Sequence, residues 1–206
     1  MKKKYSFQKK LFISLSLLGI GAILSFFFLD RPSLTFLEPF SQKYKLLFII
    51  LSFFCSDTIN LIVWFMAFVI CRFILRNFRL APIFFEFVIA ISFAESLIYF
   101  FKCILGRARP FLYLSENKFG FYFFKFSDNY HSFPSGHGTI AFLLATLASF
   151  YLPRFRFYFF GLALLLALSR IFLLEHYISD IMGSAIVAYM IGYGVHWAFQ
   201  KIHKNI

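Results

Sequence analysis

The sequence predicts an all-α membrane protein, a polytopic bundle of about six transmembrane helices in a single domain that covers residues 1–206. Two observations carry this prediction. The chain is 61% hydrophobic and 23% aromatic, with a mean hydropathy of +0.77, and a soluble globule of that composition would lack the polar residues to cover its surface. The apolar residues also fall into long runs, and a helix needs about 17–25 such residues to cross the hydrocarbon core.

The apolar runs place the predicted spans in order along the chain. We expect them at about residues 11–29, 60–75, 81–105, 135–152, 157–174 and 177–199. The segment 44–60 is also apolar, but Ser56 and Asp57 interrupt it. We therefore expect this segment to lie at the membrane interface or against the bundle, and a seven-span arrangement is the alternative. The first run follows a basic start and ends in FFFLDRPS, without a small-residue cleavage site, so we expect an uncleaved anchor.

Basic residues indicate how the chain is oriented, because cytoplasmic segments of membrane proteins are enriched in Lys and Arg. With a cytoplasmic N-terminus, that face carries bases and no acid in its segments: Lys2, Lys3, Lys4, Lys9, Lys10, Arg72, Arg76, Arg79, Arg154, Arg156, Lys201 and Lys204. We expect both termini in the cytoplasm. The formal net charge of +12 is then largely a topology signal, and we predict no nucleic-acid partner.

Three polar clusters interrupt the apolar sequence: KCILGRARP at 102–110, HSFPSGHG at 131–138 and SRIFLLEHYISD at 169–180. The first lies at the exit of the third predicted span, the second at the entrance of the fourth, and the third joins the fifth to the sixth. Odd spans end and even spans begin at the same face, so the three clusters meet at one face of the membrane. Charged groups near a bilayer are costly and usually mark function.

The residue types in these clusters favour phosphate binding. Lys102, Arg109 and Arg170 offer cationic donors, and each Arg can bind two phosphate oxygens. The backbone amides at Ser135, Gly136 and His137 lie at a predicted helix N-terminus, where unpaired N–H groups and the helix dipole attract anions. The glycine also lets an anion approach the backbone closely. No P-loop, His-Glu-x-x-His or Gly-x-Ser-x-Gly pattern points to another class of site.

Two histidines complete a site for phosphoryl transfer. His176 and Asp180 are four residues apart, and the spacing predicts that both lie on one helical face. The carboxylate can then hold the imidazole in one tautomer, which leaves the other ring nitrogen free to attack phosphorus. His137 is the candidate general acid, which donates a proton to the leaving oxygen.

The three clusters together resemble the signature of the type 2 phosphatidic acid phosphatase superfamily. That pattern is Lys, six residues and Arg-Pro, then Pro-Ser-Gly-His, then Ser-Arg, five residues, His, three residues and Asp. The matching residues are Lys102, Arg109 and Pro110; Pro134, Ser135, Gly136 and His137; and Ser169, Arg170, His176 and Asp180. The resemblance covers about residues 40–199. It implies a six-helix membrane bundle and a phosphohistidine on His176, with no metal or other cofactor.

The resemblance also implies a class of substrate. A site at the membrane surface fits a lipid phosphate, and the aromatic connector 111–133 is typical of a membrane interface. We expect a bacterial cytoplasmic (inner) membrane protein whose site faces the periplasm. Lipid A phosphatase and undecaprenyl diphosphate phosphatase are equally favoured. A phosphatidylglycerophosphate or phosphatidic acid phosphatase and a lipid phosphotransferase are the alternatives.

Several further polar residues are left open by the sequence. Arg107 lies outside the signature and is either a phosphate contact or a solvated or lipid-headgroup charge. Glu95, Glu86 and Asp57 are either site residues or packing acids. Glu175 adjoins the proposed nucleophile in sequence, but on a helix it would point elsewhere, so we place it outside the site.

Overall fold

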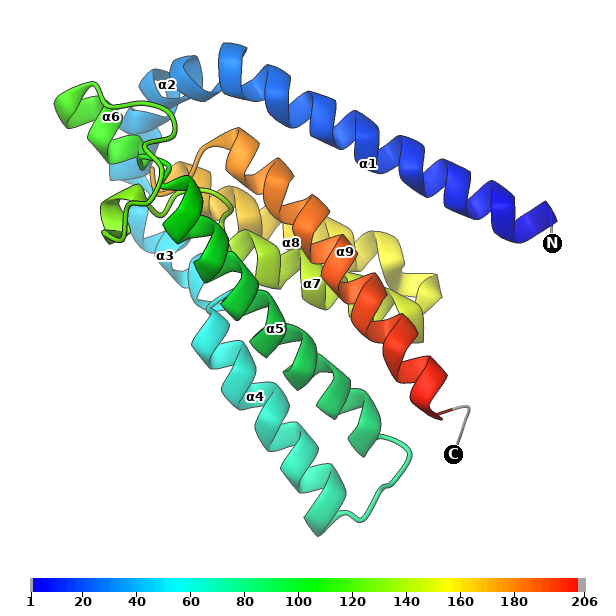
Figure 1. Ribbon diagram of the computed structural model, residues 1–206. Helices are drawn as coiled ribbons and strands as arrows, with labels where there is room; N and C mark the ends of the chain where they lie inside the picture. The colour runs from blue at the N-terminus through cyan, green and yellow to red at the C-terminus, as the bar shows by residue number, and fades with distance from the viewer. Residues whose placement is uncertain (1, 204–206) are drawn as a thin grey trace.

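The structure, a computed structural model, describes residues 2–203, with side chains described for residues 12–202. This part of the chain is mostly helical and contains no strand, which confirms the predicted all-α bundle (Figure 1). The helices are α1 (Lys2–Phe28), α2 (Asp30–Lys43), α3 (Lys45–Phe53), α4 (Asp57–Val69), the π-helix η1 (Ile70–Ile74), α5 (Ala81–Leu105), α6 (Pro110–Glu116), the 3-10 turn η2 (Asp128–Tyr130), α7 (Gly136–Tyr151), the 3-10 turn η3 (Pro153–Phe155), α8 (Arg156–Phe172) and α9 (Ile178–His203).

The described helices follow the order of the predicted spans, but four or five segments, rather than six, are long and apolar enough to cross a membrane. Four segments are long and apolar enough to cross a membrane: Lys45–Ile74, Ala81–Leu105, Pro153–Phe172 and Ile178–Ile202. A fifth crossing is possible if Phe12–Phe28 and Asp30–Lys43, which meet at a bend of 74°, form one span. The predicted span at 135–152 corresponds to α7, which has only 16 residues. α7 ends at Tyr151, because the next residue, Leu152, precedes Pro153, and the helical conformation is unfavourable for a residue before proline.

The segment 44–60 does not lie apart from the second span. α3 and α4 together form most of the 30-residue apolar segment Lys45–Ile74, and Figure 1 shows α3 leading directly into α4. α3 also packs against α8, where the ring of Phe48 stacks on that of Phe172 at 4.5 Å between centroids. The segment therefore packs against the bundle and continues into the next helix.

α7 forms the centre of the bundle, with α8 and α9 packed against it. Most of its side chains are buried, including Ile140, Leu143 and Leu147. Its contact with α9 is close enough to require glycine: a Cβ at Gly192 would lie 2.9 Å from Cγ2 of Thr146. A short apolar helix can hold this position because other helices, rather than lipid, cover its faces.

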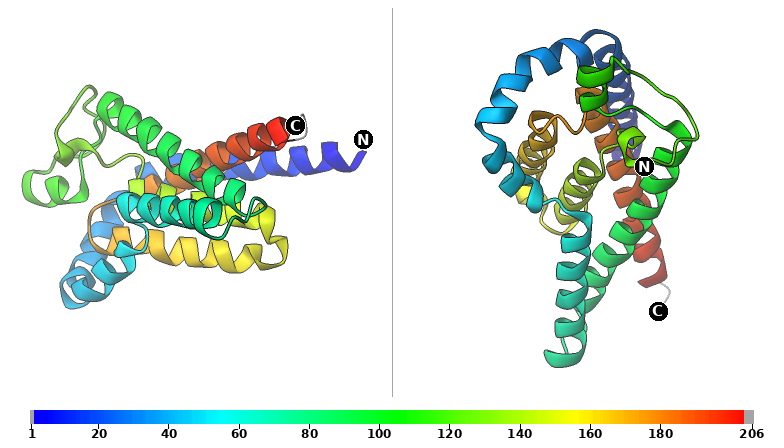
Figure 2. Two further views of the ribbon diagram at one scale, coloured as in Figure 1. Left: turned by 90° about the horizontal axis from the view of Figure 1, so that it is seen from below. Right: turned by 90° about the vertical axis from the view of Figure 1, so that its left-hand side faces the viewer.

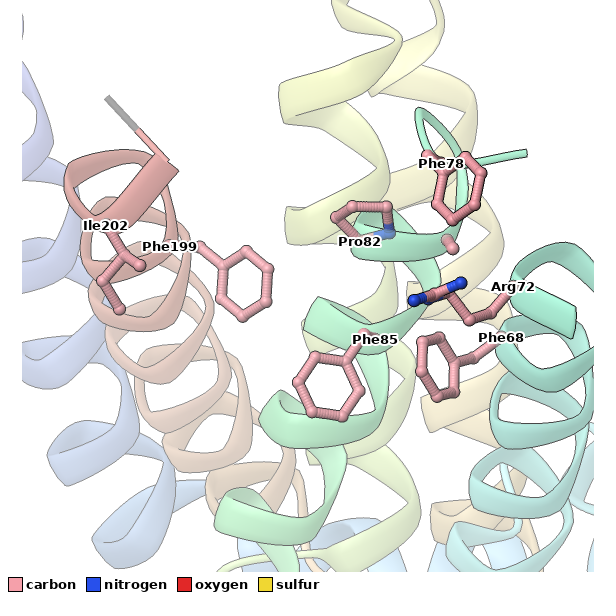
Figure 3. A pocket seen from close by; sticks show the side chains of 8 residues that line it. Phe68, Arg72, Phe78, Pro82, Phe85, Phe199 and Ile202 are labelled. Atoms are coloured by element: carbon pink, nitrogen blue, oxygen red, sulfur yellow. The ribbon is translucent and has the colours of Figure 1, made fainter. Parts of the chain in front are cut away.

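The two ends of the bundle differ in character. We call the end that carries α6 and the loop 117–135 the α6 end. The start of α1 and the end of α9 both point away from the α6 end (Figure 2). The opposite end holds a largely apolar pocket of about 340 Å³ between η1, α5 and α9, into which the Arg72 guanidinium points among aromatic rings (Figure 3). The polar clusters predicted from the sequence all lie toward the α6 end, away from this pocket.

The loop at the α6 end folds back over the bundle instead of extending away from it. The amide of Tyr122 donates to the carbonyl of Gly106 at 3.0 Å, and the amide of Ser132 donates to the carbonyl of Arg107 at 3.1 Å. Gly106 has φ of 54°, a left-handed conformation that suits glycine at a helix C-terminus. These contacts place the segment just before α7 against the segment just after α5.

Candidate active site

The end of α5 and the start of α7 form the first part of the site. Lys102 lies in the last turn of α5. Ser135 is the N-cap of α7, and its hydroxyl accepts from the amide of Gly138 at 3.2 Å. A Cβ on Gly136 would lie 3.5 Å from Nζ of Lys102. The structure thus brings this lysine to the first turn of α7, where backbone N–H groups are the usual ligands of an anion.

His176 is buried and its ring is fixed by the backbone. Its Nδ1 lies 2.7 Å from the carbonyl oxygen of Ser132. Because a carbonyl oxygen only accepts hydrogen bonds, Nδ1 must carry the proton, and Nε2 keeps a free lone pair. Burial lowers the pKa of His176 to about 3, with Arg109 and Arg170 acting in the same direction against Asp180. The residue is therefore a neutral imidazole with a defined tautomer.

The expected geometry of His176 and Asp180 differs from the observed one. α8 ends at Phe172 and α9 begins at Ile178, so His176 lies in the turn between them and the two residues do not share a helical face. Oδ2 of Asp180 lies 3.7 Å from Nδ1 of His176, farther than the Ser132 carbonyl. That oxygen instead accepts from the amide of Tyr177 at 2.8 Å and from the Ser132 hydroxyl at 2.6 Å. Asp180 thus holds both segments that position the histidine.

Arg107 is buried and forms ion pairs within the protein, so it is not a solvated charge. Only 1% of its side chain is exposed. Its guanidinium donates to Asp180, to Asp30 at 2.6 Å and to the Ser179 hydroxyl at 2.7 Å. Its carbon also lies 4.4 Å from the centroid of the Tyr177 ring. Through these two carboxylates, Arg107 links the segment after α5 to α2 and α9.

Arg109 and Arg170 converge on one acidic side chain, which the sequence prediction placed outside the site. The Glu175 carboxylate forms an ion pair with Arg109, and its Oε2 lies 3.9 Å from Arg170. Glu175 lies in the turn after α8 rather than on a helix, so the helical argument that excluded it does not apply. The two guanidiniums are also anchored to the protein, by the Asp128 carbonyl at 2.9 Å and the Ser52 hydroxyl at 2.6 Å.

His137 lies among these cations at the start of α7 and is only partly buried. It interacts electrostatically with Arg170, Lys102 and Arg109. His176 interacts with both arginines as well. The two predicted histidines therefore share one electrostatic environment that is rich in positive charge.

A family model described as "PAP2 superfamily" matches residues 83–204, which is more than half of the chain. The chain belongs to the PAP2 superfamily. Two curated relatives carry the name "Lipid A 1-phosphatase", one from Rhizobium johnstonii and one from Rhizobium etli. Each is 32% identical to this chain over 92 residues, which is 45% of the chain and 38% or 40% of the relative. The match thus spans less than half of the relatives' length. No solved structure gives a significant match.

The residues of this PAP2 chain that sequence reasoning missed share one property: none is placed by helical periodicity. Ser132 contributes a backbone carbonyl, and that contribution has no signal in the residue type. Glu175 lies in a turn, where its neighbour in sequence does not fix its direction. For Arg107, the sequence did contain a signal. An arginine that is buried within apolar sequence needs a carboxylate partner, so an ion pair could have been expected. Within the described part of the chain, no group of three or more His, Cys, Asp or Glu side chains has the arrangement of a metal site.

Proposed function

We propose that this protein is a phosphatase that hydrolyses a phosphate monoester or diphosphate of a bacterial membrane lipid through a phosphohistidine intermediate. The observation that carries the proposal is the environment of His176, a buried neutral imidazole with its Nδ1 held by the Ser132 carbonyl. A free Nε2 beside several cations is suited to attack phosphorus. Membership of the PAP2 superfamily and the names of the two relatives support a lipid phosphate as the substrate.

In the proposed mechanism, the phosphate of the lipid is bound by Lys102, Arg109 and Arg170. It is also bound by the amides at the start of α7, those of the N-cap Ser135 and of Gly136. Nε2 of His176 forms a bond to phosphorus as the bond to the lipid oxygen breaks. His137 gives its proton to that leaving oxygen. Water then attacks the phosphohistidine, its proton passes to His137, and inorganic phosphate leaves. No metal or cofactor takes part in these steps.

Asp180 acts on this reaction through position and charge. It fixes Ser132 and Tyr177 by hydrogen bonds, and its carboxylate, 3.7 Å from Nδ1, stabilises the positive charge that His176 gains when Nε2 bonds to phosphorus. The protein thereby lowers the free energy of the covalent intermediate relative to the free enzyme.

The test is a phosphate-release assay of the purified protein in detergent micelles against lipid A, undecaprenyl diphosphate, phosphatidic acid and phosphatidylglycerol phosphate. We expect release from at least one lipid, inhibition by vanadate and full activity in EDTA. A labelled donor lipid separates hydrolysis from transfer to a second lipid. Loss of activity in EDTA with recovery on adding a divalent metal would contradict the mechanism, and no release from any of the four would contradict the function.

The proposed location is a bacterial inner membrane, with both termini cytoplasmic and the site facing the periplasm. In a background without native cysteines, Ser127→Cys, next to η2, should react with an impermeant thiol reagent in intact cells. Arg154→Cys, in η3, should react only after lysis. The reverse labelling pattern would contradict the orientation.

A further inference from the structure

A cavity of about 220 Å³ adjoins the proposed phosphate position. We call it the Asp57–Glu95 pocket, and its lining comes from α4, α5 and α7: Asp57, Glu95, Ile98, Tyr99, Lys102, Gly136 and Ile140. Lys102 and Gly136 belong at the same time to the pocket and to the phosphate-binding residues. A ligand whose phosphate lies on those two residues therefore has its adjoining atoms at the mouth of this pocket.

The pocket runs along one face of α5. Glu95 and Lys102 are seven residues apart, which is two helical turns or about 10 Å along the axis. Ile98 and Tyr99 lie between them on the same face. The pocket thus has a cationic end, where the phosphate is placed, and an acidic end one to two turns farther into the bundle. A leaving alcohol that extends from the phosphate along this face of α5 would enter the pocket and meet its acidic end.

The acidic end has hydrogen-bonding capacity that the protein does not use. Oε1 of Glu95 is buried and has no hydrogen-bond partner among the described residues. Buried polar atoms are normally paired, and an unpaired carboxylate oxygen is costly. The Asp57 carboxylate accepts only from the adjacent amide of Thr58, at 3.1 Å, in the described structure. Two carboxylates that face one cavity favour a ligand with hydroxyl or N–H donors and disfavour a second anion.

We propose that the Asp57–Glu95 pocket selects a lipid phosphate whose leaving alcohol carries hydroxyl or amide N–H donors, as an acylated hexosamine does. The inference rests on the proposed function and narrows it. A polyprenyl diphosphate presents a second phosphate and then an apolar chain beside the scissile phosphorus. That phosphate would lie near two carboxylates, and no donor would reach Glu95. Of the two lipids left equal by the sequence, the pocket therefore favours lipid A over undecaprenyl diphosphate.

The experiment compares kcat/KM for lipid A with kcat/KM for undecaprenyl diphosphate in the full-length protein. The wild type should favour lipid A. Glu95→Gln replaces a charged acceptor by a weaker neutral one, so the ratio should fall by about five- to tenfold. Asp57→Asn should lower the same ratio and serves as the second variant if Glu95→Gln fails to fold. Glu38→Gln makes the same chemical change on an exposed part of α2 and should leave the ratio unaltered.

Turnover of p-nitrophenyl phosphate, whose small leaving group has no donor for Glu95, reports folding and phosphoryl transfer separately. A lowered lipid ratio in a variant that still hydrolyses this ester supports the proposal. A proportional loss on all three substrates shows a packing role for the acids and overturns it, as does a wild type that favours the diphosphate. If the wild type releases no phosphate from any substrate, the proposed function itself fails, which is a distinct result.

Discussion

The two ends of the bundle each contain a histidine beside a buried acid, yet only one has the groups for phosphoryl transfer. Away from the α6 end, Nδ1 of His196 lies 2.9 Å from Oε1 of Glu86, and the Tyr151 hydroxyl donates to the other carboxylate oxygen. The imidazole also stacks on Phe150 at 4.3 Å between centroids. Both oxygens of this acid are paired within the protein, so the cluster is suited to joining α5, α7 and α9.

The histidine at the α6 end is held differently. A backbone carbonyl orients His176, and its acid, Asp180, is bound mainly to other groups. The neighbouring cations, Arg109 and Arg170, share a single partly exposed carboxylate. A histidine beside a buried carboxylate is therefore not sufficient for a catalytic site. What distinguishes the site is surplus positive charge around an imidazole with a free nitrogen.

The largest expected effect comes from removing each histidine in turn. His176→Ala should reduce phosphate release from every substrate to background, because no nucleophile remains. His196→Ala should retain turnover but lower the thermal unfolding midpoint, because the buried Glu86 carboxylate loses a hydrogen-bond partner. Initial rates and thermal unfolding of both variants test this contrast. Lost turnover in folded His196→Ala, or turnover that persists in His176→Ala, would contradict it.

The next effect concerns the proton donor. His137→Ala should lower lipid turnover by about 10²–10⁴-fold, the usual worth of a positioned general acid. The loss should shrink with p-nitrophenyl phosphate, because its leaving group is acidic and needs little protonation. His176→Ala should gain nothing from the same ester. Equal rescue of both variants would show that the two roles are wrongly assigned.

A smaller effect is expected at Glu175, which forms ion pairs with two proposed phosphate ligands. Phosphate and this carboxylate cannot both occupy the same guanidinium positions, so Glu175→Gln should tighten inhibition by inorganic phosphate. Because the carboxylate is partly exposed, we expect a change of roughly two- to fivefold. Glu116→Gln is the matched control, since Glu116 pairs with Lys118 on the surface. Weaker inhibition would instead mean that Glu175 holds the arginines in place for phosphate.

The smallest effect should be the response of His176 to pH. Its pKa of about 3 lies below the ordinary value of 6.5, so lowering the pH from 8 to 5 should leave the free protein's imidazole neutral. Histidine ¹⁵N NMR should show one protonated Nδ1 and an unprotonated Nε2 throughout that range, with the signal assigned by its absence in His176→Asn. A titration midpoint near 6.5 would contradict the tautomer on which the mechanism depends.

The sequence predicted which polar clusters lie at the same end of the bundle, because successive membrane-spanning helices run in opposite directions. It could therefore bring Lys102, Gly136 and Arg170 to one end of the bundle. It could not predict how side chains point from turns. His176 and Glu175 were read as helical, but α9 begins only at Ile178, and Asp180 caps that helix by accepting from the Tyr177 amide. The partner of Arg107 on α2 depends on how the first helix bends, which local sequence does not specify.

The ion pair between Arg107 and Asp30 has a consequence for where this chain can be divided. The family match begins at residue 83, which would be the obvious place to truncate the chain. However, Asp30 lies far upstream of that position and is fully buried, with its carboxylate bound to Arg107 and Ser179. A fragment that starts at residue 83 would keep the guanidinium and lose one of its two carboxylates, and breaking a buried pair in this way costs about 3–5 kcal/mol. Supplied as a separate peptide, residues 1–82 should restore that pairing. We therefore expect the folding unit to begin upstream of the region that matches the family.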